Sequence, residues 1–301
     1  MQKQYEKVSL STKIVNFFFK FYKEKQIYSD EEKTKKYINE KNKQKRKYNT
    51  PIKMGMFKEE FVDMDVYSYN GTIANPKDKF LIYVHGGSFV KEAVSYQIRF
   101  AMKIAEKTNS TLIFPVYPLV PTGNYKTMYN LMDRLYKIIE KSKKNINLLG
   151  DSAGGGFVLA FSMYLRDKKI KQSSNIIMMS PWVDLSMSNP LIEKYEKNDN
   201  FGGIPGNQYA GKLWADDLDI KNYLISPLYG KFNDLAPVTI ITGERDLLKP
   251  DCVLLSEKLI EEDITHNYIE YKGQGHDFGA YPTKEGQMVI NDIASIINNS
   301  N

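Results

Sequence analysis

The sequence predicts an α/β protein with a mainly parallel β-sheet covered by helices on both faces. Short β-rich runs alternate with helix-like segments along most of the chain, as expected when helices connect parallel strands. Hydrophobic residues make up 42% of the 301 residues, enough for a large core. The single cysteine, Cys252, excludes an intrachain disulfide framework, and with only three histidines no metal site is expected.

The first fifty residues are expected to form a helical cap segment that precedes the main domain. Apolar side chains within 10–26 recur at the spacing of one helical stripe: Ile14, Phe17, Phe18, Phe21 and Tyr22. Ser9 or Ser11 could cap this helix, and its aromatic stripe should be buried. The charge-dense residues 30–48 predict a second, more exposed helix.

The main domain, 51–301, carries the alternating pattern. Apolar and β-branched runs predict strands over 61–69, 79–84, 111–117, 146–149, 175–180, 238–242 and 267–271. Helices are predicted over 95–108, 125–141, 157–165, 251–262 and 284–298. The long segment 184–235 interrupts the alternation, and a connection of this length usually has a role of its own. We expect it to be a cap insertion over the carboxyl edge of the sheet, where ligands bind in such folds.

The positive charge of the chain lies at its N-terminus. Residues 1–50 carry a net charge of +8, against −2 for the remainder. A basic arm can bind nucleic acid or an anionic membrane, but a solvated, lysine-rich helix surface is the favoured interpretation. We therefore expect no nucleic-acid partner and no membrane association. No apolar run is long enough to cross a membrane and no signal peptide is recognised, so a cytoplasmic location is expected; a homodimer is possible.

The segment Gly150-Asp151-Ser152-Ala153-Gly154 lies between an apolar strand and a helix. In that context Gly-x-Ser-x-Gly forms a sharp turn that exposes the serine hydroxyl at the strand end. The glycines on either side leave room for the strained turn. This pattern indicates that Ser152 is a catalytic nucleophile.

A serine needs a base to take its proton, and three histidines are available. His276 lies in a loop after the last strand, where it can reach Ser152, so it is the expected base. His266 begins that strand and lies at its opposite end, and His85 is expected to hold its own loop in place.

The base needs an acidic partner, and the chain order Ser, Asp, His is typical of this architecture. Asp246, directly after a strand, is the expected residue, with Glu244 and Asp251 as competitors. Asp277, adjacent to the base, is expected to point elsewhere. The oxyanion of the reaction needs backbone N–H donors, and we assign these to Gly86, Gly87 and Ala153.

With these residues assembled, residues 79–298 resemble the hormone-sensitive-lipase-like branch of the α/β-hydrolase superfamily. The resemblance rests on five blocks in the expected order: His85-Gly86-Gly87, Gly150 to Gly155, Ser180-Pro181-Trp182-Val183-Asp184-Leu185, Ser226-Pro227-Leu228-Tyr229, and the Asp246 and His276 loops. It implies the α/β-hydrolase fold, with an eight-stranded, mostly parallel sheet and a helical cap. It also implies cofactor-free ester hydrolysis through an acyl-enzyme, by Ser152, His276 and Asp246.

The chain departs from the family pattern at two places. Ser88 replaces a frequent third glycine, and Tyr117-Pro118-Leu119-Val120-Pro121 lacks the usual arginine.

Taken together, these motifs predict a serine carboxylesterase for small to medium acyl esters. A deacetylase of carbohydrates or other small molecules on the same triad is the alternative, followed by a non-catalytic binding protein. Four aromatic residues are candidate pocket walls: Phe89, Phe157, Trp182 and Tyr229.

Overall fold

A nine-stranded sheet forms the centre of the molecule in the computed structural model, which describes residues 1–19, 24–43, 48–197, 199 and 202–300. The strand order is β1-β9-β8-β7-β6-β4-β5-β3-β2. The strands are β1 (Gln2–Tyr5), β2 (Phe57–Glu59), β3 (Asp65–Tyr69), β4 (Lys79–Val84), β5 (Ser110–Val116), β6 (Asn145–Asp151), β7 (Asn175–Met179), β8 (Val238–Gly243) and β9 (His266–Tyr271). All neighbouring strands from β1 to β5 in this spatial order are parallel. At the far edge, β3 is antiparallel to β5 and β2 is antiparallel to β3.

The resemblance implied eight strands, and the structure corrects this number. The first strand, β1, pairs in parallel with β9 over Gln2 to Tyr5, so the expected helical segment 1–50 begins with an edge strand of the sheet. Its sequence, QKQY, has no apolar alternation, and the strand signal is therefore absent from the residues themselves. Strand β2 is three residues long and was missed for a similar reason.

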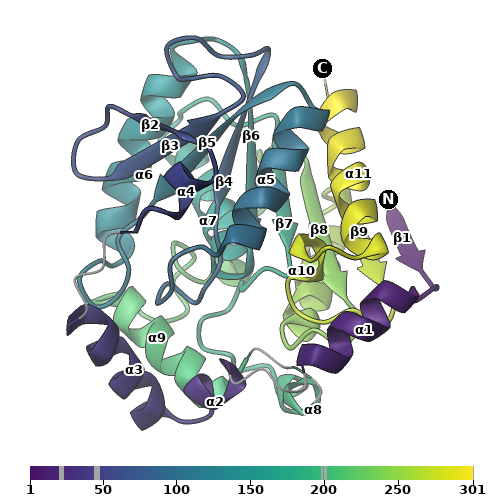
Figure 1. Ribbon diagram of the computed structural model, residues 1–301. Helices are drawn as coiled ribbons and strands as arrows, with labels where there is room; N and C mark the ends of the chain where they lie inside the picture. The colour runs from purple at the N-terminus through teal and green to yellow at the C-terminus, as the bar shows by residue number, and fades with distance from the viewer. Residues whose placement is uncertain (20–23, 44–47, 198, 200–201, 301) are drawn as a thin grey trace.

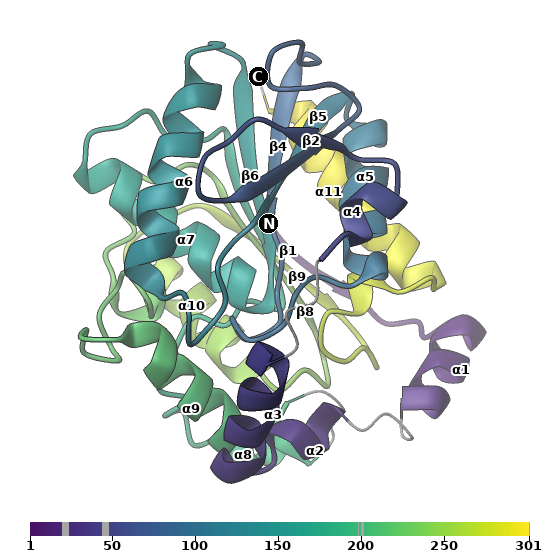
Figure 2. The same ribbon diagram turned by 60° about the vertical axis from the view of Figure 1, so that its left-hand side comes forward.

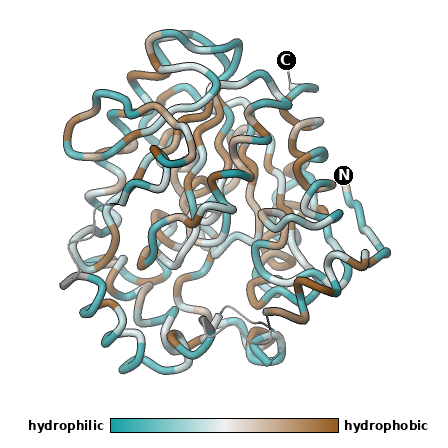
Figure 3. The backbone as a smooth tube through the Cα atoms, in the orientation of Figure 1, coloured by the Kyte–Doolittle hydropathy of each residue, from teal (hydrophilic) through white to brown (hydrophobic). Residues whose placement is uncertain are grey.

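Helices cover both faces of the sheet (Figure 1). The alternation of side chains along a strand sends Leu81 and Tyr83 to one face, against α5 (Ser95–Lys107) and α11 (Lys284–Asn299). Phe80, Ile82 and Val84 point to the other face. There they join α6 (Tyr125–Glu140), α7 (Ser152–Asp167) and α10 (Lys249–Glu261). Figure 3 shows hydrophobic residues gathered in the central strands.

Further helices lie beyond the carboxyl edge of the sheet. They are α2 (Glu24–Tyr28), α3 (Glu31–Lys43), α8 (Ile192–Glu196) and α9 (Ile204–Ala215), while α4 (Thr50–Lys53) lies beside α5. Both α2 and α3 pack against α9, so the N-terminal region and the segment 184–235 meet at this end of the molecule (Figures 1 and 2). That segment also holds the short 3-10 helix η1 (Pro227–Tyr229).

The first helix, α1 (Leu10–Phe19), contradicts one expectation. Its N-terminus is capped by Ser9, whose Oγ accepts a hydrogen bond from the Thr12 amide at 3.2 Å. The apolar stripe, however, is not buried: the side chains of Ile14, Phe17 and Phe18 are exposed. Phe21 and Tyr22, the other members of the predicted stripe, lie outside the described residues.

Candidate functional site

Ser152 lies at the junction of β6 and α7, in the left-handed region with φ of +51°. This conformation is rare for a residue with a side chain and marks a constrained turn. The turn depends on glycine, because a Cβ at Gly150 would collide with the backbone of Gly154, and one at Gly154 with the carbonyl oxygen of Val84. The sequence forms a sharp bend here because glycine occupies both positions.

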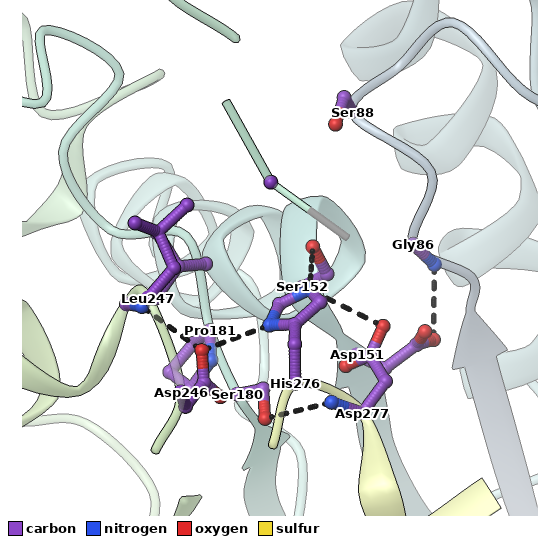
Figure 4. Close-up of polar contacts among 12 residues, drawn as sticks. Gly86, Ser88, Asp151, Ser152, Ser180, Pro181, Asp246, Leu247, His276 and Asp277 are labelled. Atoms are coloured by element: carbon purple, nitrogen blue, oxygen red, sulfur yellow. Dashed lines mark hydrogen bonds and ion pairs between the residues drawn. The ribbon is translucent and has the colours of Figure 1, made fainter. Parts of the chain in front are cut away.

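Ser152, His276 and Asp246 come together in one hydrogen-bonded chain (Figure 4). The Nε2 atom of His276 lies 2.9 Å from the Ser152 hydroxyl. Its Nδ1 atom lies 3.0 Å from Oδ1 of Asp246. Asp246 follows β8 and His276 follows β9, so the parallel strands bring their carboxyl ends to one edge. The ring of His276 thus has one nitrogen on the hydroxyl and the other on a fully buried carboxylate.

The pKa values of the pair follow from burial and mutual charge. Burial opposes protonation of His276, but the carboxylates of Asp277 and Asp246 outweigh it and raise the pKa of His276 well above its ordinary value. Burial also favours the neutral form of Asp246. The charge and hydrogen bond of His276 nevertheless hold the pKa of Asp246 below its usual value. The arrangement stabilises an imidazolium beside a carboxylate.

Asp277 does not point away from the site, which corrects the expectation. Its Oδ2 atom lies 3.4 Å from Nε2 of His276, and its backbone is left-handed with φ of +53°. Burial and the nearby charge of Asp151 raise the pKa of Asp277 well above its ordinary value, although the His276 charge opposes this. Both neighbouring carboxylates, Asp277 and Asp246, therefore act on the pKa of His276.

Asp151 organises the loop on the other side of Ser152. Its fully buried carboxylate accepts hydrogen bonds from the Tyr83 hydroxyl at 2.6 Å and from the side-chain amide of Gln97 at 2.6 Å. It also accepts one from the Gly86 backbone amide at 2.9 Å. The amide of Gly86 is therefore engaged and does not face an oxyanion, contrary to its predicted role. Sequence reasoning had treated Asp151 only as part of the serine motif.

The other two predicted oxyanion donors, Gly87 and Ala153, differ from Gly86 in their hydrogen bonding. In the described turns and loops, the backbone amides of Gly87 and Ala153 donate to no backbone carbonyl. Gly87 has φ of +119°, a conformation that favours glycine. A Cβ at Gly86 would lie 2.8 Å from that of Ser152, so glycine there allows the close approach of loop and serine.

The loop after β4 is held by its neighbours. Tyr117 donates its hydroxyl to the His85 carbonyl oxygen at 2.7 Å and stacks on the His85 ring at 4.4 Å between centroids. His85 Nδ1 is 2.7 Å from the Gly86 oxygen, so the ring lies within its own loop as expected. Ser88, the residue in place of a third glycine, donates its hydroxyl to Asn207 on α9 at 2.7 Å.

The alternative acid and base residues lie elsewhere. Glu244 accepts a hydrogen bond from the Gly273 amide at 2.8 Å, and Asp251 is buried in the first turn of α10, bonded to Asn189. His266, at the start of β9, lies 2.7 Å from the Ser256 hydroxyl. None of these contacts involves Ser152.

A cavity of about 1360 Å³ opens beside Ser152 and His276. It is bounded by the Gly86 to Ser88 loop, by α2 and α3, and by Asn207 of α9. Of the four aromatic residues suggested as walls, only Trp182 lines it. Phe89 instead stacks on Trp214 at 3.9 Å, and Phe157 packs in the core. In the described ranges, no group of three or more His, Cys, Asp or Glu side chains could hold a metal ion.

The comparisons with known proteins agree with this architecture. The family described as alpha/beta hydrolase fold matches residues 81–280, and the chain belongs to this family. The chain is 26% identical over 211 residues to a triacylglycerol lipase of Mycobacterium tuberculosis, covering 69% of this chain but 44% of that protein. It is 25% identical over 222 residues to an esterase of Acinetobacter venetianus, covering 72% and 73% of the two chains.

Solved structures share the fold. An esterase of the bacterial hormone-sensitive lipase family superposes with a TM-score of 0.77 at 17% identity, over 98% of this chain and 99% of the other. An esterase/lipase from an uncultured bacterium gives 0.79 at 18% identity, over 97% and 99%. The α/β-hydrolase resemblance inferred from the motifs is confirmed by the family match to residues 81–280, and these structures show the same fold. Of the helices in the described part of the chain, none has the length and apolarity needed to cross a bilayer.

Proposed function

We propose that this protein is a serine carboxylesterase that hydrolyses small to medium acyl esters through an acyl-enzyme. The observation that carries the proposal is the hydrogen-bonded chain from Asp246 through His276 to Ser152, at the wall of a cavity. Relatives named triacylglycerol lipase and esterase support the same class of reaction.

In the proposed cycle, the Ser152 hydroxyl attacks the ester carbonyl carbon while Nε2 of His276 takes its proton. The amides of Ala153 and Gly87 stabilise the oxyanion. His276 then gives the proton to the leaving alcohol, and an acyl-serine remains. Water, deprotonated by His276, attacks this second ester, and collapse of the intermediate restores Ser152 and releases the carboxylic acid. Asp246 keeps the imidazole in the correct tautomer and stabilises its cation.

We further propose that α2, α3 and α9 act as a cap over the cavity. Residues of α2 and α3 line the same cavity as Ser152, and Asn207 of α9 reaches the loop that carries Gly87. A cap of this kind limits the size of the ester that can enter. The deacetylase alternative is supported by a relative in Salmonella paratyphi B named acetyl esterase, 29% identical over 221 residues.

The proposal is tested by replacing the nucleophile. Ser152→Ala should abolish turnover of p-nitrophenyl esters from acetate to octanoate and should prevent labelling by a fluorophosphonate. Ser162→Ala is the matched control, because Ser162 lies on the same helix but bonds its hydroxyl to the Val158 carbonyl. Undiminished turnover or labelling in the Ser152 variant would refute the proposal, and the chain-length profile separates the esterase from the deacetylase.

A further inference from the structure

We propose that α1 is an interfacial helix that docks the protein onto the surface of an anionic lipid bilayer. The observation behind this proposal is that the polar side of α1 faces the protein and its apolar side faces outward. A helix that packs on a hydrophobic core has the opposite arrangement. This inference replaces the expectation that the aromatic stripe is buried and membrane association absent.

The inward side of α1 is fixed by polar contacts. The Thr12 hydroxyl, almost fully buried, donates to Glu285 at 2.7 Å. The Ser9 hydroxyl donates to the same carboxylate at 2.6 Å, and the Asn16 amide donates to the Gly273 carbonyl at 3.2 Å. Val15 adds an apolar contact with the core beneath. These bonds set the rotation of the helix, so its opposite side must face outward.

The outward side is apolar. Leu10, Ile14 and Phe18 lie at i, i+4 and i+8, on one stripe of the helix. Their exposed fractions are 72%, 49% and 67%. Phe17, beside them, is 56% exposed and meets the Phe18 ring edge-on. A contiguous exposed stripe of this kind marks an interaction surface rather than isolated exposed residues.

The charge around the stripe favours an anionic lipid surface over a second copy of this chain. Lys7 and Lys13 are exposed, and α1 contains no acidic residue. Nearby Glu6 is paired with Lys272 at 2.7 Å, and Glu285 is directed inward, to Ser9 and Thr12. Two such lysine-flanked helices would repel each other, whereas acidic headgroups would attract both.

The position of α1 suits a docked orientation. It lies at the same end of the molecule as α2 and α3 (Figures 1 and 2), and these two helices line the cavity beside Ser152. A bilayer that contacts α1 would therefore lie beside the end of the molecule where the cavity is found.

The experiment is flotation of the full chain with vesicles of phosphatidylcholine alone or mixed with phosphatidylglycerol. We expect binding to the mixed vesicles, weakened by added salt. The double variant Ile14→Gln with Phe18→Gln should lower the partition coefficient roughly tenfold or more. Ile260→Gln is the matched control and should bind as the parent does, because Ile260 is an exposed isoleucine on α10, 61% exposed against 49% for Ile14. Ser152→Ala should also bind unchanged, so the result does not depend on the proposed activity.

Three outcomes would overturn the proposal. The first is no binding to the mixed vesicles at low salt. The second is equal loss of binding in the double variant and the Ile260 control. The third is a parent dimer in light scattering that the double variant converts to a monomer, without any vesicle binding. Circular dichroism and turnover of p-nitrophenyl acetate, expected to be unchanged, exclude unfolding as the cause of lost binding.

Discussion

At the residue scale, the proposed chemistry of the site depends on the protonation state of one imidazole. His276 can accept the Ser152 proton only when it is neutral, yet the buried Asp246 carboxylate favours its charged form and raises its pKa. The same carboxylate is needed to stabilise the imidazolium formed during attack. As a consequence, activity should be lost on acidification at a higher pH than it would be with a free imidazole as the base.

The pH profile checks this argument. As the pH falls through the raised pKa of His276, kcat/KM should fall, with a midpoint above the ordinary histidine value of 6.5. In Asp246→Asn the attraction of the Asp246 carboxylate for the proton is lost, so the midpoint should move to lower pH and kcat should drop by about 10² to 10⁴-fold. Rates followed by pH-stat avoid the titration of a coloured leaving group. An unchanged midpoint in the variant would contradict the assignment of Asp246.

At the scale of single elements, buried charges at helix starts affect stability as well as geometry. Asp251, in the first turn of α10, is fully buried, and one of its carboxylate oxygens accepts a hydrogen bond from Asn189 at 2.9 Å. Burial, opposed by the Asn189 hydrogen bond and aided by the charge of Asp184, raises the pKa of Asp251 from 3.8 to about 7. The ionised form is therefore costly in the folded protein.

The sign of the pH effect on stability follows from this shift. Between pH 3.8 and about 7 the folded state binds more protons than the unfolded state, so the free energy of unfolding decreases as the pH rises through this window. Asp251→Asn removes the carboxyl group that titrates in this window. Urea denaturation should find the variant more stable than the parent at pH 8, by up to about 4 kcal/mol. The difference should be much smaller at pH 4. An equal difference at both values would exclude the raised pKa.

The elements that the sequence predicted well share a strong local signal. Runs such as Phe80 to Tyr83 are apolar and buried, so the strand β4 was located to the residue. β1 carries no such signal, since its place depends on pairing with β9. The strand predicted over 61–69 begins at Asp65 instead. The aromatic stripe of α1 had the expected helical period, but period alone does not tell which side faces the protein.

At the scale of the whole molecule, the site is assembled from segments far apart in the chain. The approach of Ser152, Asp246 and His276 could be predicted, because parallel strands bring their carboxyl ends to one edge. The contacts of Asp151 with Gly86, and of Asp277 with His276, could not. They depend on loop conformations, including the left-handed backbone of Asp277. The sequence therefore indicates the positions of Ser152, Asp246 and His276 more plainly than the contacts of the residues around them.

The contact between Ser88 and Asn207 joins the loop after β4 to the segment 184–235. Either Ser88→Ala or Asn207→Ala removes a hydrogen bond of about 1 kcal/mol and should free the loop that carries Gly87. We expect kcat/KM to fall roughly fivefold in each variant, with little change in thermal midpoint. The double variant should lose no more than Asn207→Ala alone, which also removes the hydrogen bond from the Asn207 side-chain amide to the Gly203 carbonyl oxygen. Additive losses in this cycle would mean that the two residues act separately.

The strand β1 also has a consequence for self-association. It occupies the outer edge of β9, and its own side chain Lys3 is bound to Asp292 at 2.8 Å. Free backbone groups on a sheet edge can pair with another chain, and a short polar strand that is already bound there prevents such pairing. With β1 paired along β9, a neighbouring copy of this chain cannot add a strand directly to β9.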